Sequence, residues 1–239
     1  MNLRQIINSK VYTAALEELP LNQKCIINTI NPHSYCVAKK DTVFTEALLS
    51  SDVLLPDGAG IVLAAKVLEG KTISKIAGAD IHQYLLEQAQ LKGQKVFYLG
   101  AAQNTLDLIE KRIRKEFPNI QVASYSPPYK AEFSAHDTLE MLQKANAFNP
   151  DILFVGMTAP KQEKWVFENK DEINANTIVS IGAVFDFFAG TVKRSSPFWI
   201  KLGLEWLPRL LRDPKRLWKR NFVSTPTFLF DLFTAKVKK

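Results

Sequence analysis

A carboxylate and two glycines follow an apolar run, at a position where a parallel sheet would present them to a ligand. The run covers residues 53–55, and Asp57, Gly58 and Gly60 come before a helical pattern begins. In open α/β sheets, ligands bind at the carboxyl ends of the strands, and glycines there allow close approach to the backbone. Asp57 could act as a general base or bind a ribose. Taken alone, an aspartate in this position is better explained as a helix cap.

Polar residues and glycines follow other apolar runs as well, and a parallel sheet would gather them at one edge. They are Thr29, Asn31, Gly100, Gly156, Pro160, Glu163 and Asp186. Helix N-termini at such an edge present free N–H groups and a positive dipole end, which suit a nucleotide diphosphate.

Each of these residues also has a simpler explanation. Gly100 and Gly156 would only permit tight turns between a strand and a helix. Glu163 would be a favourable charge in a first helical turn, and Asp186 a loop cap. Thr29 and Asn31, which follow the first apolar run, would hydrogen-bond to nearby backbone groups. These explanations account poorly for the recurrence of polar residues and glycines at successive strand ends.

Six short apolar runs alternate with longer helical patterns from residue 23 to about residue 190. The predicted strands are 24–28, 52–55, 95–99, 121–125, 151–155 and 177–181. The predicted helices lie near 32–49, 59–69, 80–92, 103–116, 134–147 and 159–172. This alternation predicts an α/β fold, with a mainly parallel sheet and helices on both faces.

The positive charge of the chain is concentrated near its C-terminal end. Residues 193–239 hold 12 Lys and Arg against three acidic residues, a net charge of +9. The first 192 residues hold 19 basic and 21 acidic residues, a net charge of −2. Tryptophans and leucines also recur at helical spacing after residue 198. We therefore expect an α/β body at 1–192 and a basic, aromatic, helical appendage at 193–239 that meets an anionic surface or a diphosphate.

Several function classes lack their sequence motifs in this chain. There is no G-x-G-x-x-G, no G-x-x-x-x-G-K-[ST] and no G-x-S-x-G. No two aspartates stand at D-x-D spacing, and the three histidines lack metal-ligand spacing, so we expect no metal and no other cofactor. Cys25 and Cys36 fit reduced, packed thiols. With no signal peptide pattern and no uncharged apolar run of about 18 residues, we expect a cytoplasmic protein.

Six motifs in order resemble the WecG/TagA/CpsF family, glycosyltransferase family 26. They are Thr29-x-Asn31-Pro32, Asp57-Gly58-x-Gly60, Gly78-x-Asp80, Pro160-Lys161-Gln162-Glu163, Phe185-Asp186-Phe187-x-x-Gly190 and Glu205-Trp206-x-x-Arg209-Leu210. The resemblance implies a compact Rossmann-like fold of the GT-E type, with a C-terminal appendage that completes the site and helps membrane docking. It also implies a bacterial enzyme that moves a sugar from a UDP donor to a polyprenyl-diphosphate-linked saccharide.

The same resemblance implies roles for individual residues. Asp57 matches the proposed general base, Thr29 lies beside it, and Gln162 lies near the transferred sugar, so these three are the expected catalytic residues. The expected substrate-binding residues are Asn31, Gly58, Gly60, Asp80, Gly100, Gly156, Pro160, Glu163, Asp186, Arg209, Arg216 and Arg220. The three arginines of this set resemble those that reach the diphosphates. The implied donor is UDP-N-acetylmannosamine, its uronic acid or UDP-glucose, and the implied acceptor is undecaprenyl-diphosphate-linked.

General chemistry agrees with these roles. Glycosyl transfer needs a base for the acceptor hydroxyl and positive charge to stabilise the departing UDP. Without a D-x-D site, arginines or helix dipoles would supply that charge. One carboxylate acting opposite the leaving group would invert the anomeric carbon. We expect an inverting, metal-independent transferase at the inner face of the plasma membrane.

Two alternatives stay open at this point. The tryptophans of the appendage could pack it onto the body or onto a neighbouring subunit of a homo-oligomer, instead of facing anionic lipid. The alternative function is nucleic-acid binding through the basic tail, suggested by a calculated pI of about 9.3. Against it, the positive charge is confined to the tail and the body has no motif that reads RNA or DNA, so we expect no nucleic-acid partner.

Overall fold

The computed structural model describes residues 2–192, 199, 206–212 and 214–237. Its strands are β1 (Cys25–Ile30), β2 (Val53–Pro56), β3 (Lys95–Gly100), β4 (Gln121–Tyr125), β5 (Ile152–Gly156) and β6 (Thr177–Ser180). Each lies within about two residues of a predicted strand, because each predicted run is apolar, short and followed by turn residues.

The six strands form one sheet in the order β2-β1-β6-β5-β3-β4, and every neighbouring pair is parallel. β2 and β5 are buried along their whole length, as are strands covered by helices on both faces. The prediction of an α/β fold with a parallel sheet is confirmed. All six carboxyl ends lie at one edge of the sheet, which is where ligands bind in folds of this kind.

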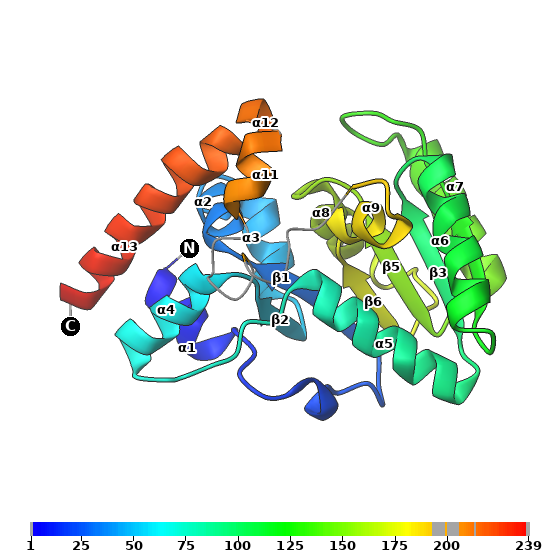
Figure 1. The fold of residues 1–239 in the computed structure, drawn as a ribbon, viewed down its shortest axis with the longest axis horizontal. Coiled ribbons are helices and arrows are strands. Elements are labelled where there is room, and N and C mark those ends of the chain that lie inside the picture. Colours follow the sequence, from blue (N-terminus) through cyan, green and yellow to red (C-terminus); the bar gives the residue numbers. More distant parts are fainter. Residues whose placement is uncertain (1, 193–198, 200–205, 213, 238–239) are drawn as a thin grey trace.

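Helices cover both faces of the sheet (Figure 1). In the body they are α1 (Leu3–Ser9), α2 (Pro32–Ala38), α3 (Thr42–Leu49), α4 (Ala59–Glu69), α5 (Gly78–Lys92), α6 (Gln103–Glu116), α7 (Ala135–Phe148), α8 (Lys161–Asn169) and α9 (Ala183–Ala189). A short 3-10 turn, η1, covers Leu16–Glu18. The apolar side chains of α5, α6 and α9 share a cluster with one face of the sheet, and those of α7 and α8 share a cluster with the other.

The prediction of one helix at 32–49 is wrong, because the chain forms two. α2 ends at Ala38, and Asp41 then caps α3 by accepting a hydrogen bond from the N–H of Phe44 at 2.9 Å. An aspartate at this position stabilises a new helix start, since it satisfies an N–H group that has no partner within the helix.

The appendage comprises α11 (Trp206–Arg212), α12 (Pro214–Trp218), the π-helical turn η2 (Lys219–Ser224) and α13 (Thr225–Val237). Figure 1 shows α13 at one end of the molecule, with α6 and α7 at the other. α13 packs on α1, α2 and α4 of its own chain. Phe228 and Leu232 are buried in the same cluster as Ile30 and Leu54 of the sheet. The described part of the appendage therefore packs on its own body.

Polar contacts hold α13 along its length. Arg4 donates to the carbonyl of Ala235 at 2.9 Å, and Lys236 donates to the carbonyl of Val67 at 2.8 Å. None of the helices in the described ranges is long and apolar enough to cross a membrane.

Candidate active site

The ends of β1 and β2 bring three of the expected site residues together. Thr29 pairs with Leu55 in the parallel register. The N–H of Asp57 then donates to the carbonyl of Ile30 at 2.9 Å, which extends the pairing beyond β2. Asn31 follows directly on the neighbouring strand. Thr29, Asn31 and Asp57 therefore lie on two adjacent strand ends, as the sequence predicts.

Asp57 does not occupy the capping position of the helix that follows it. The N-cap of α4 is Gly58, which has a φ of 100° and makes no side-chain capping bond. A positive φ of this size favours glycine, because other residues meet steric strain there. The N-cap position falls on Gly58, one residue after the half-buried Asp57, and the role of the Asp57 side chain stays a prediction.

Asn31 caps α2 through its side-chain oxygen. Its Oδ1 accepts hydrogen bonds from the N–H groups of His33 and Ser34, both at 3.0 Å. In return, the backbone N–H of Asn31 donates to Oγ of Ser34 at 2.8 Å, which completes a capping box. Hydrogen bonding to local backbone groups, the simpler explanation of Asn31, therefore accounts for its side-chain oxygen. Its expected contact with substrate stays a prediction.

The appendage contributes a cation next to this strand edge. Nδ1 of His33 lies 2.9 Å from Oγ of Ser224, and the Cys36 thiol donates to the carbonyl of Ser224 at 3.3 Å. Burial and then the nearby charge of Arg220 lower the pKa of His33. Arg220 on η2 therefore lies within electrostatic range of His33, in the first turn of α2.

Other expected residues of the appendage are placed less completely. Arg209 lies on α11 and Arg216 on α12, the two helices that lead into η2. Glu205, part of the sixth motif, lies outside the described residues. The roles expected for these residues stay predictions.

Gly100 and Gly156 allow two strand ends to approach closely. The N–H of Ala101 donates to the carbonyl of Gly156 at 2.9 Å, and a Cβ at Gly100 would overlap that same carbonyl. A Cβ at Gly156 would overlap the ring of Phe185 on α9. Gly100, with a φ of 121°, adopts a conformation that favours glycine, as the tight-turn explanation expects, whereas Gly156 is explained by its close packing against Phe185. A contact of either backbone with substrate stays a prediction.

Gln162 joins the turns that follow β5 and β6. Its Oε1 accepts from the N–H of Met157 at 3.1 Å and from the N–H of Gly182 at 3.0 Å. Its Nε2 donates to Oε1 of Glu163 at 2.8 Å. Both side chains are buried, with 5% and 3% of their surface exposed. The amide of Gln162 is thus engaged by the backbone of two turns at the site edge, and its expected catalytic role stays a prediction.

Asp80 and Asp186 both make local hydrogen bonds. Oδ2 of Asp80 accepts from the N–H of Ala77 at 2.8 Å and caps α5. The preceding residue, Ile76, donates its N–H to the carbonyl of Pro56 at 3.0 Å, which ties this segment to the end of β2. Asp186 lies in the first turn of α9 and not in a loop, and its carboxylate accepts from Oγ1 of Thr191 at 3.3 Å.

Gly60 and Pro160 have clear places in the local packing. A Cβ at Gly60 would come within 2.5 Å of Cγ of Pro32 and 3.5 Å of the Phe228 ring. The glycine therefore lets α4 pack closely on α2 and α13. Pro160 is the N-cap residue of α8. For both residues, substrate contact stays a prediction.

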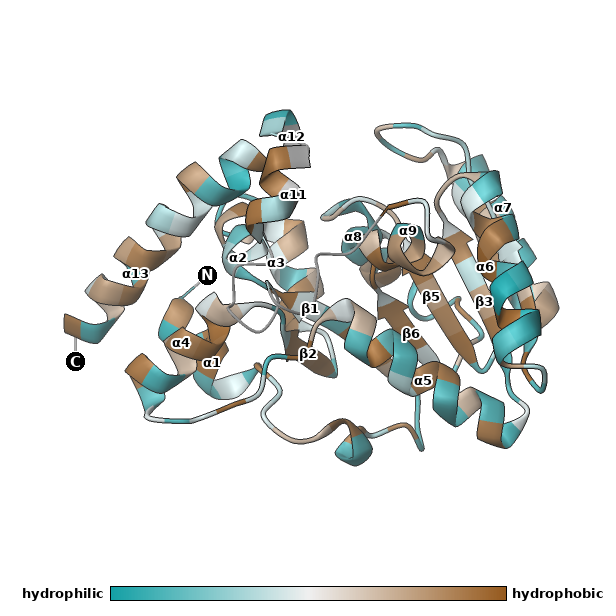
Figure 2. Cartoon of the chain, viewed as in Figure 1, coloured by the Kyte–Doolittle hydropathy of each residue, from teal (hydrophilic) through white to brown (hydrophobic). Residues whose placement is uncertain are grey.

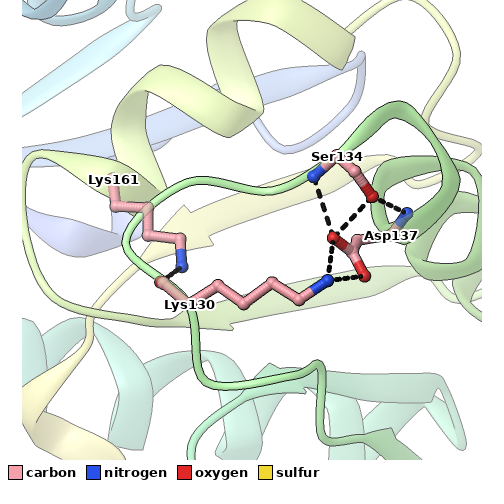
Figure 3. A network of polar contacts seen from close by, with 4 residues as sticks. All are labelled: Lys130, Ser134, Asp137 and Lys161. Carbon is pink, nitrogen blue, oxygen red and sulfur yellow. Dashed lines mark hydrogen bonds and ion pairs between the residues drawn. The ribbon is translucent and has the colours of Figure 1, made fainter.

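A network of four residues near α8 did not emerge from the sequence as part of the site (Figure 3). Lys130 donates to both carboxylate oxygens of Asp137, at 2.9 and 2.8 Å. The N–H of Ser134 also donates to Asp137 at 2.8 Å. These bonds, led by the one from Lys130, hold the pKa of the Asp137 carboxyl well below its usual range. The spacing Ser134-x-x-Asp137 was the available signal, since it is typical of a capping box.

Lys161 connects this network to the predicted site motif. Its Nζ donates to the carbonyl of Lys130 at 2.5 Å and lies 3.5 Å from the centroid of the Phe133 ring. The loop between β4 and α7 is thereby fastened to the first turn of α8 (Figure 3).

In the parts of the chain that the structure describes, no group of three or more His, Cys, Asp or Glu side chains could hold a metal. Metal independence stays a prediction.

A parallel sheet whose carboxyl edge gathers a carboxylate, helix N-termini and a cation is the architecture of α/β enzymes that bind nucleotide-type ligands. The model of the Glycosyl transferase WecG/TagA/CpsF family matches residues 4–239, and the chain belongs to this family of glycosyltransferases.

Bacterial relatives match most of the chain. A Bacillus subtilis protein named N-acetylglucosaminyldiphosphoundecaprenol N-acetyl-beta-D-mannosaminyltransferase is 34% identical over 226 residues, which cover 94% of this chain and 86% of the relative. The protein of the same name from Bacillus spizizenii is 35% identical over 211 residues, covering 88% and 79%. That from Staphylococcus aureus is 29% identical over 212 residues, covering 89% and 81%. Family membership favours glycosyl transfer over the nucleic-acid-binding alternative.

Proposed function

We propose that this protein transfers N-acetylmannosamine from UDP to N-acetylglucosamine linked to undecaprenyl diphosphate, in the synthesis of a bacterial cell-surface polysaccharide. The three relatives described above carry a name that states this acceptor and this sugar. Of the donors that the sequence left open, UDP-N-acetylmannosamine is the one that fits that name.

One observation carries the proposal: Asp57 follows β2 beside the strand end that leads to Asn31 and α2, and the appendage brings Arg220 within electrostatic range of His33 in the first turn of α2. A carboxylate at this edge can take the proton of the acceptor hydroxyl as the hydroxyl attacks the anomeric carbon. A cation nearby can stabilise the negative charge that develops on the departing UDP. Asp57 is therefore the proposed base and Arg220 a proposed diphosphate ligand.

The proposed reaction inverts the anomeric carbon and needs no metal. A single displacement by the acceptor, with Asp57 opposite the leaving group, gives inversion. Arg209, Arg216 and Arg220 provide the positive charge that a metal ion supplies in other transferases. Because the described appendage packs on its own chain, Arg220 and Asp57 are proposed to act from the same subunit.

The appendage also suits binding to an anionic membrane surface from the cytoplasmic side. Aromatic side chains on η2 and α13 are exposed, among them Phe222 at 63% and Phe230 and Phe233 at 67% each. Lys215 and Lys219 are exposed on the adjoining turns. Figure 2 shows the mixture of hydrophobic and hydrophilic residues along α13. Exposed aromatics next to lysines are typical of segments that lie in a lipid headgroup region.

The experiment that tests the function is UDP release from a panel of UDP-sugars, with a synthetic polyprenyl-diphosphate-linked N-acetylglucosamine as acceptor. We expect turnover with UDP-N-acetylmannosamine that persists in EDTA, and a β-linked product by NMR. Turnover only with UDP-glucose would overturn the proposed donor. Activity lost in EDTA and restored by a divalent cation would overturn metal independence, and retained anomeric configuration would overturn the single displacement.

A further inference from the structure

Polar atoms without a hydrogen-bond partner gather between α8 and the sheet. Among the described residues, the buried side-chain atoms in this condition are Oδ1 of Asn28, Oγ of Ser180, Oε2 of Glu163 and Nε1 of Trp165. Buried polar groups are normally paired, because an unpaired one loses its hydration without compensation. The four residues lie on α8 and on the strands β1 and β6, and their unpaired atoms call for an explanation.

The strand register places two of these residues on the same face of the sheet. Ile27 of β1 pairs with Val179 of β6. One position further along both strands, Asn28 and Ser180 must point to the opposite face, since side chains alternate along a strand. That face holds Ile26 and Ile178, which cluster with Trp165 of α8. Asn28 and Ser180 thus lie on the sheet face that α8 covers.

Glu163 is held on the buried side of the same helix. It is 3% exposed, and α8 packs on β6 and α3. One of its oxygens accepts from Gln162 at 2.8 Å, and the other lacks a partner among the described residues. An ionised carboxylate in this condition is strongly disfavoured, whereas a neutral carboxyl group could donate its proton to a neighbouring acceptor. Burial accordingly raises the pKa of Glu163 to about 7, and its bond to Gln162 offsets part of the effect.

Charged groups nearby do not offset this burial. β5 and β6 carry no ionisable residue, and β1 carries only Cys25, at its opposite end. The ionisable groups on α8 and at α3 are Asp41, Glu46, Lys161, Lys164 and Glu168. Lys164 is paired with Asp41 at 3.1 Å, and Lys161 with the carbonyl of Lys130. Glu46 and Glu168 carry the same charge as an ionised Glu163 and would not stabilise it.

The orientation of the Gln162 amide depends on Glu163. Oε1 of Gln162 accepts from two backbone N–H groups, so the amide must keep its NH₂ group on the other side, where Glu163 accepts from it. The two turns that Gln162 joins are close, since a Cβ at Gly182 would overlap the carbonyl of Met157. Loss of the Glu163 acceptor would leave the buried NH₂ group of Gln162 unpaired, which would weaken the hold of Gln162 on both turns.

We propose that Glu163 is a positioning residue that works in its protonated form. One oxygen accepts from Gln162, and the buried second oxygen carries the proton, for which the unpaired Oδ1 of Asn28 on the sheet face that α8 covers is the available acceptor. By fixing Gln162, Glu163 holds the turns after β5 and β6 in the geometry that the sugar-nucleotide site needs. The inference rests on the proposed function in one respect, that these turns border that site. It removes Glu163 from the residues expected to contact substrate.

The matched pair Glu163→Gln and Glu163→Leu tests this proposal. Glutamine keeps an oxygen acceptor and an NH₂ donor, so it reproduces the protonated carboxyl group without being able to ionise. We expect Glu163→Gln to keep kcat within about threefold of the wild type, and Glu163→Leu to lose about 10-fold to 100-fold because the turns are misplaced. In the wild type, kcat should fall as the pH rises above about 7, and Glu163→Gln should lack this alkaline decline.

Two activity results would overturn the proposal. The first is a Glu163→Gln enzyme as inactive as Glu163→Leu, since this would mean that an ionised carboxylate is needed. The second is an alkaline decline that stays unchanged in Glu163→Gln. If Glu163→Leu does not fold, the pH profile of Glu163→Gln still decides the question.

A readout that needs no turnover separates this proposal from the proposed function. Difference infrared spectra of the folded protein at about pH 6 should contain a protonated carboxyl band that Glu163→Gln lacks. The wild type should also lose thermal stability relative to Glu163→Gln as the pH rises from about 4.5 to about 7, since only the folded state keeps the proton in that range. If no sugar donor is turned over, but the carboxyl band and the pH-dependent difference in thermal stability both appear, the positioning role stands and the transferase proposal fails. A missing carboxyl band overturns the positioning role, whatever the activity.

Discussion

The hydroxyl of Ser224 lies 2.9 Å from Nδ1 of His33, across a sequence separation of 191 residues. His33 belongs to the first turn of α2, directly after the capping residue Asn31. Ser224 ends the π-helical turn that carries Arg220. This contact joins η2, the turn that carries Arg220, to the first turn of α2 at the strand edge of the proposed site.

Replacing Asp57 by asparagine should abolish transfer without unfolding the protein. Asparagine fits the same space, and the bond from residue 57 to Ile30 uses the backbone N–H, which remains. Loss of a general base typically lowers the rate by roughly 100-fold to 10,000-fold. We expect a fall of this size in kcat for UDP release, with UDP binding retained in calorimetry. The exposed Asp171→Asn is the matched control, and equal activity of both variants would show that the base lies elsewhere.

Acidification should destabilise the protein through His33. Burial and Arg220 lower the pKa of His33 below its usual value of 6.5, so the unfolded chain binds the proton more readily than the folded one. The stabilisation is therefore complete above about pH 6.5 and is lost as the pH falls below it. Thermal unfolding between pH 7.5 and 5 should show this loss in the wild type and a smaller loss in His33→Gln. Parallel curves for the two proteins would contradict the prediction.

Gly60→Ala should destabilise the protein, although glycine-to-alanine changes inside helices usually stabilise. The new Cβ would lie 2.5 Å from Cγ of Pro32, so α4 and α2 would have to separate. We expect a loss of about 1–3 kcal/mol in the free energy of unfolding, measured in urea. An increase in stability, as helix propensity alone predicts, would show that the packing of α2 on α4 adjusts freely.

Two phenylalanines of α13 should give opposite results. Phe228 is fully buried and Phe230 is 67% exposed. Phe228→Ala should lower the free energy of unfolding by about 3–5 kcal/mol and make the appendage more sensitive to proteolysis, because it opens a cavity under α13.

Phe230→Ala should leave stability nearly unchanged and weaken flotation with vesicles of anionic lipid. Combining it with Phe233→Ala should weaken flotation further. Wild-type flotation that neither change affects would place the membrane-binding surface elsewhere, and absence of wild-type flotation would overturn the membrane role.

The sheet was predictable because its strands are short, apolar and punctuated by turn residues. Helices were less so. The break after Ala38 has neither glycine nor proline, and only the cap by Asp41 marks it. α9 was missed, although Gly190, in a left-handed conformation with a φ of 80°, ends it as a typical C-terminal glycine.

The site was predictable only in part. Placing Asp57 beside Asn31 follows from the rule that parallel strands end at one edge. The contact of His33 with the appendage does not follow from any such rule, because it depends on how α13 packs against helices that are distant in the sequence. Nor does local sequence reveal that Gln162 bonds to Gly182, 20 residues away.

The docking of α13 has a consequence for the order in which the chain matures. α13 covers apolar side chains of α1, α2 and α4, all of which are synthesised long before residues 225–237. During translation, the sheet and its helices can fold while this surface remains uncovered. The nascent body then exposes this apolar surface to chaperones until α13 has left the ribosome. A chain cut before α13 would be prone to aggregation as well as inactive.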